Sequence, residues 1–324
     1  MIKILRLGDP HIRPSNIDES DNLLQFVVDK ALEHKVDRIE ILGDLFHTHA
    51  VLRLEVLDFW AHWLDTLNDV CPTYVLVGNH DQSGDYNSNS NALKVFSTRH
   101  KKNLHIVEDA RAEGSIGYMA YIHDKKKFFE LAMELKEQGV KTLVCHQTFA
   151  GSQYENGFFA PDGINPDELP FDTIISGHIH AMQRFGKVIY PGTARWDSIS
   201  DANEVKGIWI YEHDDEGKII KETLFQTNEV CTPILSFTWN EGEEEPVIPE
   251  NSRSAIELIG SSDWISKQKG KFKGKVSIKT KITDKKRLEN RKTGNSLEYF
   301  IKNLFVSTIS RESLLKTMKE LNLV

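Results

Sequence analysis

The chain has 324 residues, 40% of them hydrophobic and 27% charged, with a formal net charge of −8, which is typical of a globular protein holding one ordinary domain and a smaller one. No apolar run approaches the roughly 18 residues of a membrane helix, and Cys71, Cys145 and Cys231 are too widely spaced for zinc-type pairs or a disulfide framework. We therefore expect no membrane span and an intracellular, reducing compartment.

Short β-rich runs alternate with longer amphipathic runs over the first 225 residues. The apolar N-terminal run is too short for a secretory leader, so we expect it to be the first strand. Helical periodicity predicts helices at 23–34, 54–67 and 128–136. Strands are predicted at 2–7, 38–42, 73–77, 142–145, 173–176 and 188–190, followed by a hairpin of 208–211 with 219–225. This alternation indicates an α/β layered fold.

The last third of the chain has a different character. Residues 83–91 are polar and predict a loop, and the acidic, proline-containing segment 240–250 predicts a linker. A basic, β-like stretch follows around 256–283. Apolar periodicity at 297–305 and 314–323 predicts a helical hairpin. The predicted domains are therefore 1–239, a small basic domain at 251–293, and the hairpin at 294–324.

Metal-type side chains follow five of the predicted strands. They are Asp9 and His11, then Asp44 and His47, then Asn79, His80 and Asp81, then His146, and finally His178 and His180. Any one of these alone is more simply a turn or a satisfied surface residue. Because ligands gather at the carboxyl ends of strands in α/β sheets, the joint occurrence predicts that all five segments converge on one site.

Oxygen and imidazole donors suit manganese, iron, zinc or magnesium. Cys145, beside His146, faces the opposite side of its strand, so the set contains no thiolate and does not indicate a structural zinc site. A carboxylate that bridges two cations roughly 3.5–4 Å apart would form the clamp that favours in-line attack at phosphorus. Glycines at 43, 78 and 177 allow the backbone to turn sharply toward such cations.

Taken together, Asp-x-His, Gly-Asp, Gly-Asn-His-Asp, a single His and Gly-His-x-His resemble the calcineurin-like metallophosphoesterase superfamily over about residues 1–225. The resemblance implies a four-layer α-β-β-α sandwich with a small α+β capping domain and a C-terminal helical hairpin. Within the superfamily, the segments at 43–47, 177–180, 190–193 and 204–210 are similar to the SbcD-type nuclease subunit of the SbcC–SbcD repair complex. The short chain and compact tail resemble a bacteriophage version.

This resemblance also implies roles for individual residues. Seven would hold two Mn²⁺ ions, with Mg²⁺ as an alternative: Asp9, His11, Asp44, Asn79, His146, His178 and His180, with Asp44 bridging. His80 would lie beside the phosphate as a general acid, oriented by Asp81, and His47 would assist there. Arg13 stands where the family generally has glycine. It would either contact a phosphate or be a tolerated surface residue.

The basic stretch carries lysines at alternate positions. Residues 264–292 hold twelve Lys or Arg against two acids, a net charge of +10, so the rest of the chain carries −18. In a strand, Lys267, Lys269, Lys271, Lys273 and Lys275 would share one face. They would either protect a solvated edge strand or contact the backbone of duplex DNA.

The resemblance implies a metal-dependent DNA exonuclease and endonuclease acting especially on duplex ends. It further implies a homodimer, an SbcC-like coiled-coil ATPase partner that docks on the tail hairpin, and a cytoplasmic location, in a bacterial host if the protein is phage-encoded. Two alternatives remain open. One is a phosphatase or phosphodiesterase for small nucleotides, against which the basic stretch argues, and the other is a non-catalytic DNA-binding scaffold.

Overall fold

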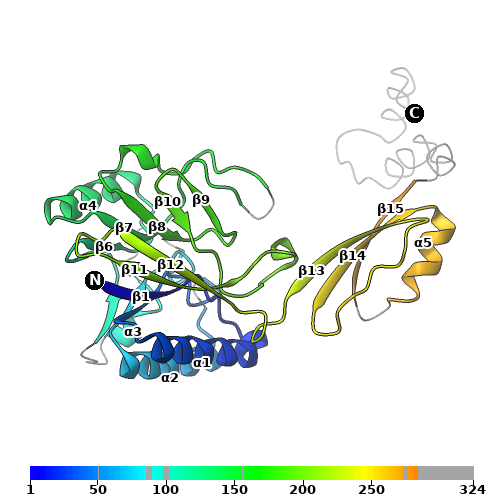
Figure 1. The fold of residues 1–324 in the computed structure, drawn as a ribbon, viewed down its shortest axis with the longest axis horizontal. Coiled ribbons are helices and arrows are strands. Elements are labelled where there is room, and N and C mark those ends of the chain that lie inside the picture. Colours follow the sequence, from blue (N-terminus) through cyan, green and yellow to red (C-terminus); the bar gives the residue numbers. More distant parts are fainter. Residues whose placement is uncertain (50, 85–89, 98–102, 155–156, 273–275, 284–324) are drawn as a thin grey trace, which may run out of the picture. The chain divides into compact units, whose positions relative to one another are not determined.

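The computed structural model describes residues 1–49, 51–84, 90–97, 103–154, 157–272 and 276–283. The chain divides into two compact units (Figure 1). The first comprises Met1–Ser236 and Pro249–Arg253, and the second comprises Phe237–Ile248 and Ser254–Val324. The predicted helical hairpin at 294–324 lies outside the described residues.

The first unit contains two six-stranded sheets. In the first sheet the order is β12 (Ile219–Gln226), β11 (Gly207–His213), β1 (Ile2–Leu7), β2 (Arg38–Ile41), β3 (Thr73–Leu76) and β4 (Leu104–Val107). Strands β1 to β4 run parallel, and β11 pairs antiparallel with β1 and with β12. The carboxyl ends of β1, β2 and β3 therefore lie at one edge of the sheet.

The second sheet has the order β5 (Ala110–Glu113), β6 (Ile116–Met119), β7 (Thr142–His146), β8 (Thr173–Gly177), β10 (Val188–Tyr190) and β9 (Gln183–Phe185). Its central strands β6, β7, β8 and β10 are parallel, and β5 and β9 are antiparallel edges. The two sheets pack face to face through a buried apolar cluster that includes Ile4, Leu76, Val144 and Ile175.

Helices cover the outer faces of both sheets (Figure 1). Helices α1 (Ile17–His34) and α2 (Leu54–Val70) cover the first sheet, burying Leu24, Val27 and Trp60, among others. Helix α4 (Lys125–Glu137) covers the second through Phe128 and Leu135, and α3 (Lys94–Ser97) is a single turn. These layers confirm the predicted α-β-β-α sandwich. No helix in the described part of the chain is long and apolar enough to cross a membrane.

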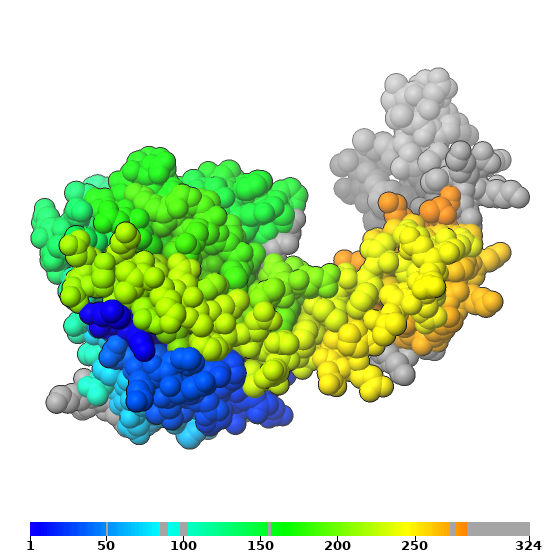
Figure 2. Space-filling view, viewed as in Figure 1, coloured from blue at the N-terminus to red at the C-terminus, as the bar shows by residue number. Residues whose placement is uncertain are grey.

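The predicted hairpin near residue 215 is present as β11 and β12. Figure 2 shows the dark blue N-terminal residues at the surface against the yellow-green residues of this hairpin. There the Met1 ammonium group forms an ion pair with Asp215.

The described residues of the second unit form a three-stranded sheet with one helix. Its strands have the order β13 (Ile234–Asn240), β14 (Arg253–Gly260) and β15 (Ser277–Ile282). The predicted linker lies between β13 and β14. A small core of Trp239, Ile256, Leu258, Ile265 and Phe272 packs between the sheet and helix α5 (Ser262–Lys269).

The prediction that five alternating lysines share one strand face is wrong. Lys267 and Lys269 lie in the last turn of α5, Lys271 follows the helix, and Lys273 and Lys275 lie outside the described residues. Two physical causes favour the helix. The Ser261 hydroxyl caps it by accepting from the Trp264 amide, and β14 pairs in parallel with β15, which requires a crossover connection.

A buried polar network links strands β1, β2 and β11. Arg6 donates from Nε to Glu40 at 2.6 Å, and its Nη1 lies 3.0 Å from His213 Nε2. A guanidinium can only donate, so this nitrogen of His213 accepts, and His213 Nδ1 donates to the Gly217 carbonyl at 2.8 Å. The imidazole is therefore held neutral, and burial together with Arg6 lowers the pKa of His213 to about 4.

This network predicts acid sensitivity. Between about pH 6.5 and pH 4, His213 is protonated in the unfolded chain but neutral in the folded chain. The free energy of unfolding therefore decreases as the pH falls through this window, by up to about 3 kcal/mol. His213→Gln keeps an acceptor and a donor but does not titrate. Urea unfolding from pH 7 to pH 4 should show the wild type losing about that much more stability than the variant. Parallel stability curves would contradict the assignment.

Candidate metal centre

The loops after β1, β2 and β3 of the first sheet and after β7 and β8 of the second meet at one edge of the sandwich. The structure brings together there all seven side chains predicted as ligands: Asp9, His11, Asp44, Asn79, His146, His178 and His180. Four of them, Asp9, His11, Asp44 and His146, are at most 2% exposed. Segments separated by up to 171 positions in the sequence thus form one buried polar cluster.

The cluster has two halves that share one carboxylate. Asp9, His11 and His180 each place one donor atom within 4.8 Å of the others, and so do Asp44, His146 and His178. Asp44 Oδ2 lies 3.5 Å from His11 Nε2 and 3.3 Å from His146 Nε2. Asp44 is therefore in the position of a bridging ligand.

Asn79 completes the second half. Its Oδ1 atom lies 2.9 Å from His146 Nε2 and 2.8 Å from His178 Nδ1. In the first half, the Nε2 atoms of His11 and His180 are 3.0 Å apart. Several nitrogen and oxygen donors thus converge on each of two small volumes.

The donor set fits divalent cations. Asp9 Oδ1 is buried and has no hydrogen-bond partner among the described residues. Leaving a carboxylate oxygen unpaired in a buried site is costly. Carboxylate, amide and imidazole donors without thiolate suit manganese, magnesium, zinc or iron. The burial, the shared carboxylate and the unpaired oxygen all fit divalent cations.

The electrostatics point in the same direction. Burial alone would raise the pKa of Asp44, but the neighbouring His146 and His11 imidazoles hold it below its usual value. Burial works against a charged His146, yet the Asp44 and Asp9 carboxylates raise its pKa to about 9. Burial raises the pKa of Asp9 to about 6 and lowers that of His178 to about 3. Without a bound cation, a proton on His146 supplies positive charge that a cation would otherwise supply.

Backbone carbonyls orient the histidines. His146 Nδ1 donates to the Leu42 carbonyl at 2.7 Å, which directs Nε2 toward Asp44 and Asn79. The His178 amide donates to Asp9 Oδ2 at 2.6 Å, and its ring stacks on Tyr121 with centroids 5.8 Å apart. Such contacts fix ring orientation and tautomer at metal sites.

The backbone at the site is strained. Asp9, His11, Asp44 and His178 all have positive φ, at 25°, 46°, 52° and 82°. Non-glycine residues in such conformations cost of order 1–3 kcal/mol each and cluster at functional sites. The four ligand-bearing turns are therefore held by their surroundings against local preference.

Two glycines leave room for the carboxylates. A Cβ atom on Gly78 would lie 2.2 Å from Asp44 Oδ1, and one on Gly177 would lie 2.5 Å from Asp9 Oδ1. Only glycine lets these strand ends approach the carboxylates so closely.

His80 lies directly beside the cluster. One of its nitrogens is within 4.8 Å of donor atoms of His11 and Asp44, and its Nδ1 donates to the His47 carbonyl at 2.7 Å. That bond leaves Nε2 available to a substrate. Burial lowers the pKa of His80, so the ring is largely neutral at pH 7 in the chain alone.

The predicted role of Asp81 in orienting His80 is wrong, because the His47 carbonyl orients it. The Asp81 carboxylate instead accepts from the backbone amides of Phe46 and Gly78, both at 3.0 Å. It thereby ties the second and third ligand loops together. Burial and the nearby Asp44 charge raise the pKa of Asp81 to about 8.

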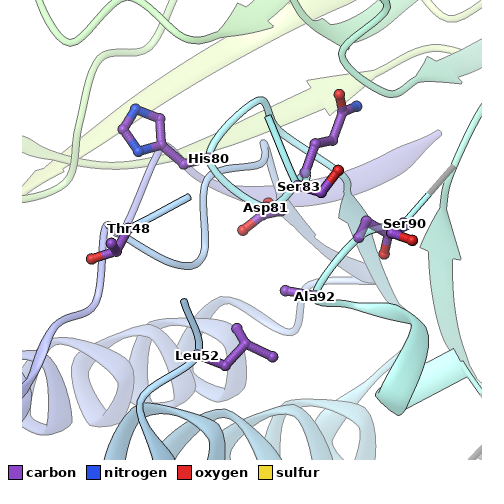
Figure 3. A pocket seen from close by; sticks show the side chains of 9 residues that line it. Thr48, Leu52, His80, Asp81, Ser83, Ser90 and Ala92 are labelled. Carbon is purple, nitrogen blue, oxygen red and sulfur yellow. The ribbon is translucent and has the colours of Figure 1, made fainter. Parts of the chain in front are cut away.

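A cavity of about 170 Å³ opens next to His80. Figure 3 shows Thr48 and His80 on one side of it and Ser83 and Ser90 on the other, with Leu52 below. Asp81 and Gln82 also line it. The cavity adjoins the cluster from the side of His80.

Arg13 and His47 lie together at the partly open side of the cluster. Arg13 Nη1 is 3.1 Å from His47 Nε2, and its Nη2 is 3.2 Å from Asp197 Oδ1. Since guanidinium only donates, His47 accepts through Nε2. The Arg13 side chain is 28% exposed, so it presents a permanent positive charge near the cluster.

Comparison with known proteins identifies the family. A profile of calcineurin-like phosphoesterases matches residues 2–182, more than half of the chain. The chain belongs to the calcineurin-like phosphoesterase family. It is therefore a member of a family of metal-dependent phosphoester hydrolases, and the resemblance read from its motifs is confirmed.

Three relatives of this phosphoesterase are informative. It is 30% identical to the predicted phosphoesterase 244L of Invertebrate iridescent virus 6 over 59% of this chain and 69% of that protein. It is 24% identical to exonuclease subunit 1 of Enterobacteria phage T4 over 66% of each chain. It is 21% identical to the DNA double-strand break repair protein Mre11 of Nanoarchaeum equitans over 80% of this chain and 75% of that protein.

Sequence reasoning missed several residues that contact the cluster. Tyr121 stacks on His178, Arg195 bonds the backbone of the first ligand loop, and Lys206 bonds the carbonyl of His180. Tyr121 and Arg195 lie outside the five motifs and no spacing rule marks them. Arg195 and Lys206 are 1% exposed, and burial of this kind is visible only in the folded chain.

Cation binding should be measurable as added stability. Mn²⁺ at 100 times its dissociation constant should stabilise the phosphoesterase by about 2.7 kcal/mol per site. In Gly177→Ala the added methyl group would displace the Asp9 carboxylate, so most of this gain should disappear. Urea unfolding with Mn²⁺ and with EDTA measures the difference. Gly270→Ala is the control, because its Cβ would meet only a contact at 3.6 Å. Equal Mn²⁺ stabilisation in both variants would contradict the assigned geometry.

Proposed function

We propose that this phosphoesterase is a two-metal DNA nuclease, with exonuclease and endonuclease activity, in an SbcC–SbcD-like complex. The observation that carries the proposal is the shared Asp44 carboxylate between two donor sets, with His80 beside both. When bound, two divalent cations, Mn²⁺ by resemblance and Mg²⁺ as the alternative, supply charge neutralisation at the phosphodiester and activation of the attacking water.

His80 acts on the leaving oxygen. Its Nδ1 is occupied by the His47 carbonyl, so Nε2 faces the substrate. A phosphodiester brings negative charge next to the ring and raises the pKa that burial lowers, so the imidazole takes a proton as substrate binds. Protonated Nε2 then donates to the leaving 3′ or 5′ oxygen as a general acid.

Arg13 and His47 bind the adjacent phosphate. The guanidinium is charged at every relevant pH and offers a planar set of donors to phosphate oxygens. Its contacts with His47 and Asp197 restrict where it can point. This arrangement favours a chain of successive phosphates over a single small phosphate ester.

DNA is favoured as the substrate by two independent features. The relatives in phage T4 and Nanoarchaeum equitans are named as an exonuclease subunit and a double-strand break repair protein. The segment 264–292 carries a net charge of +10, and such basic segments suit a nucleic-acid backbone. Five lysines of this segment form the proposed DNA contact: Lys267, Lys269, Lys271, Lys273 and Lys275. The structure describes the first three of them.

A second candidate is a phosphodiesterase or phosphatase for small nucleotides. The iridescent virus relative, named only as a phosphoesterase, favours it. The basic segment counts against it, because a small substrate needs no extended cationic surface. A non-catalytic scaffold is disfavoured because all seven donors are present in one cluster.

The proposed partners are a coiled-coil ATPase and a second copy of the chain. The apolar residues of α2, including Trp60, Trp63 and Leu64, are buried in the unit's own core. The family resemblance implies a dimer contact around residues 60–67 of this helix, and such a contact would therefore use its exposed face. A cytoplasmic location, in the host cell for a phage protein, remains part of the proposal.

Loss of His80 should separate chemistry from cation binding. His80→Ala should reduce cleavage of linear duplex DNA in Mn²⁺ by about 10²–10⁴-fold while cation affinity stays within a few-fold. His34→Ala, a histidine in the last turn of α1, is the matched control and should keep full activity. Product release from end-labelled duplex measures the rate. An active His80→Ala enzyme would refute the assigned role.

Neutralising the lysines should weaken DNA binding in a salt-dependent way. The triple variant Lys267→Gln, Lys269→Gln, Lys271→Gln should lower the slope of log K against log salt by up to about 0.9 per lysine. Cleavage of a small chromogenic phosphodiester should stay unchanged. Lys125→Gln, Lys126→Gln, Lys136→Gln on α4 is the control of equal charge. Unchanged DNA affinity in the first triple variant, or an equal loss in both, would favour the small-nucleotide alternative.

A further inference from the structure

Two fully buried cationic side chains lie under the candidate metal centre. Arg195 and Lys206 are each 1% exposed. They lie on the segment between β10 and β11, which supplies none of the seven donors. Lys and Arg are almost never fully buried unless they are paired, so their partners need an explanation.

Both cations donate to backbone carbonyls of ligand loops. Arg195 donates from Nε to the Pro10 carbonyl at 3.2 Å and from Nη2 to the His11 carbonyl at 3.1 Å. Lys206 Nζ donates to the His180 carbonyl at 2.9 Å. The loop that carries Asp9 and His11 and the loop that carries His180 are thus each held by a buried cation.

Two carboxylates connect these cations into one network. Arg195 Nη2 donates to Asp197 Oδ1 at 2.8 Å. The Asp197 amide donates to Asp201 Oδ2 at 3.0 Å, and Lys206 Nζ donates to Asp201 Oδ1 at 3.0 Å. A continuous chain of bonds therefore runs from the His11 carbonyl to the His180 carbonyl.

The carbonyls that the network contacts belong to the first half of the cluster or to its neighbour Pro10. Asp9, His11 and His180 form the first donor set, and the loop of His180 also carries His178 of the second set. Within the described part of the chain, neither cation bonds the backbone of Asn79, His146 or His178, the residues of the second half. The direct contacts with ligand residues are therefore those to the carbonyls of His11 and His180, both members of the first set.

Stability does not explain the network. Replacing buried ion pairs by apolar residues of similar volume is often neutral or stabilising, because desolvation offsets the attraction between the charges. The contacted turns also have strained backbone, with φ of 25° at Asp9 and 46° at His11. A fixed donor on the carbonyls at this turn opposes its relaxation.

We propose that Arg195 and Lys206 are positioning residues that set the affinity of the first cation site, formed by Asp9, His11 and His180. The inference rests on the proposed metal centre and adds that these two residues act on the first cation site. Asp197 extends the network toward the substrate, because it also holds the Arg13 guanidinium at 3.2 Å. The first site and the phosphate-binding arginine are therefore held by one scaffold, which the described residues connect directly to ligands of the first set only.

The test titrates each site separately with Mn²⁺ in full-length protein. His146→Ala leaves the first donor set, and His180→Ala leaves the second. In the His146→Ala background, Lys206→Met and Arg195→Lys should each lower Mn²⁺ affinity about 10–100-fold, as loss of contacts that orient metal ligands does. Arg195→Lys retains charge but has one ammonium group for two carbonyls, so it keeps the test usable if the Lys206 variant does not fold. In the His180→Ala background both changes should leave Mn²⁺ affinity within about two-fold.

Arg6→Met is the matched control. Arg6 is equally buried and ion-paired to Glu40, but it bonds no ligand backbone. It should lower folding stability without a selective effect on either site. Equal weakening of both sites by the Lys206 and Arg195 variants, or weakening of neither, would overturn the proposal while leaving the nuclease proposal intact. If the wild type itself bound no Mn²⁺, the metal centre and this inference would both fail.

Discussion

The structure depends on one electrostatic constraint, which is that a buried volume at the sheet edge holds more donor atoms than the chain alone can satisfy. Two carboxylates, four imidazoles and an amide converge there, and Asp9 Oδ1 finds no partner among the described residues. A proton on His146 compensates part of the charge of Asp44 and Asp9. Divalent cations would compensate the remaining charge, which agrees with the metal dependence of the family.

The packing of the fold offsets the backbone strain at the ligand-bearing turns. Four ligand-bearing residues have positive φ, and strain of this kind persists only where the surroundings over-determine the backbone. The packed sheets provide those surroundings through the apolar cluster between them. The glycines at 78 and 177 give the carboxylates room, and the buried Arg195 and Lys206 hold the first and last ligand loops. The packing of the sheets therefore maintains both the strained backbone and the geometry of the ligands.

Much of this could be predicted from the sequence, and particular residues show why the rest could not. The strands before Asp9, Asp44, Asn79, His146 and His178 are short β-rich runs, and in all but the fourth a glycine precedes the polar residue, so these local signals are reliable. The lysine alternation misled because α5 is specified by the Ser261 cap and by the parallel pairing of β14 with β15, which is a long-range property. Asp81 was misassigned for a similar reason, because its partners Phe46 and Gly78 are backbone amides without a sequence signal. Strands β4 to β6 were missed although they are as long as the predicted β2 and β3, because no metal-type motif or strong apolar run marks them in the sequence.

The most direct test of the central claim is anomalous X-ray diffraction from crystals of the full-length protein grown with Mn²⁺. The account predicts two anomalous peaks roughly 3.5–4 Å apart, with Asp44 contacting both. One peak should lie against Asp9, His11 and His180, and the other against Asn79, His146 and His178. A single peak away from Asp44, or ordered water in place of both ions at saturating Mn²⁺, would contradict it.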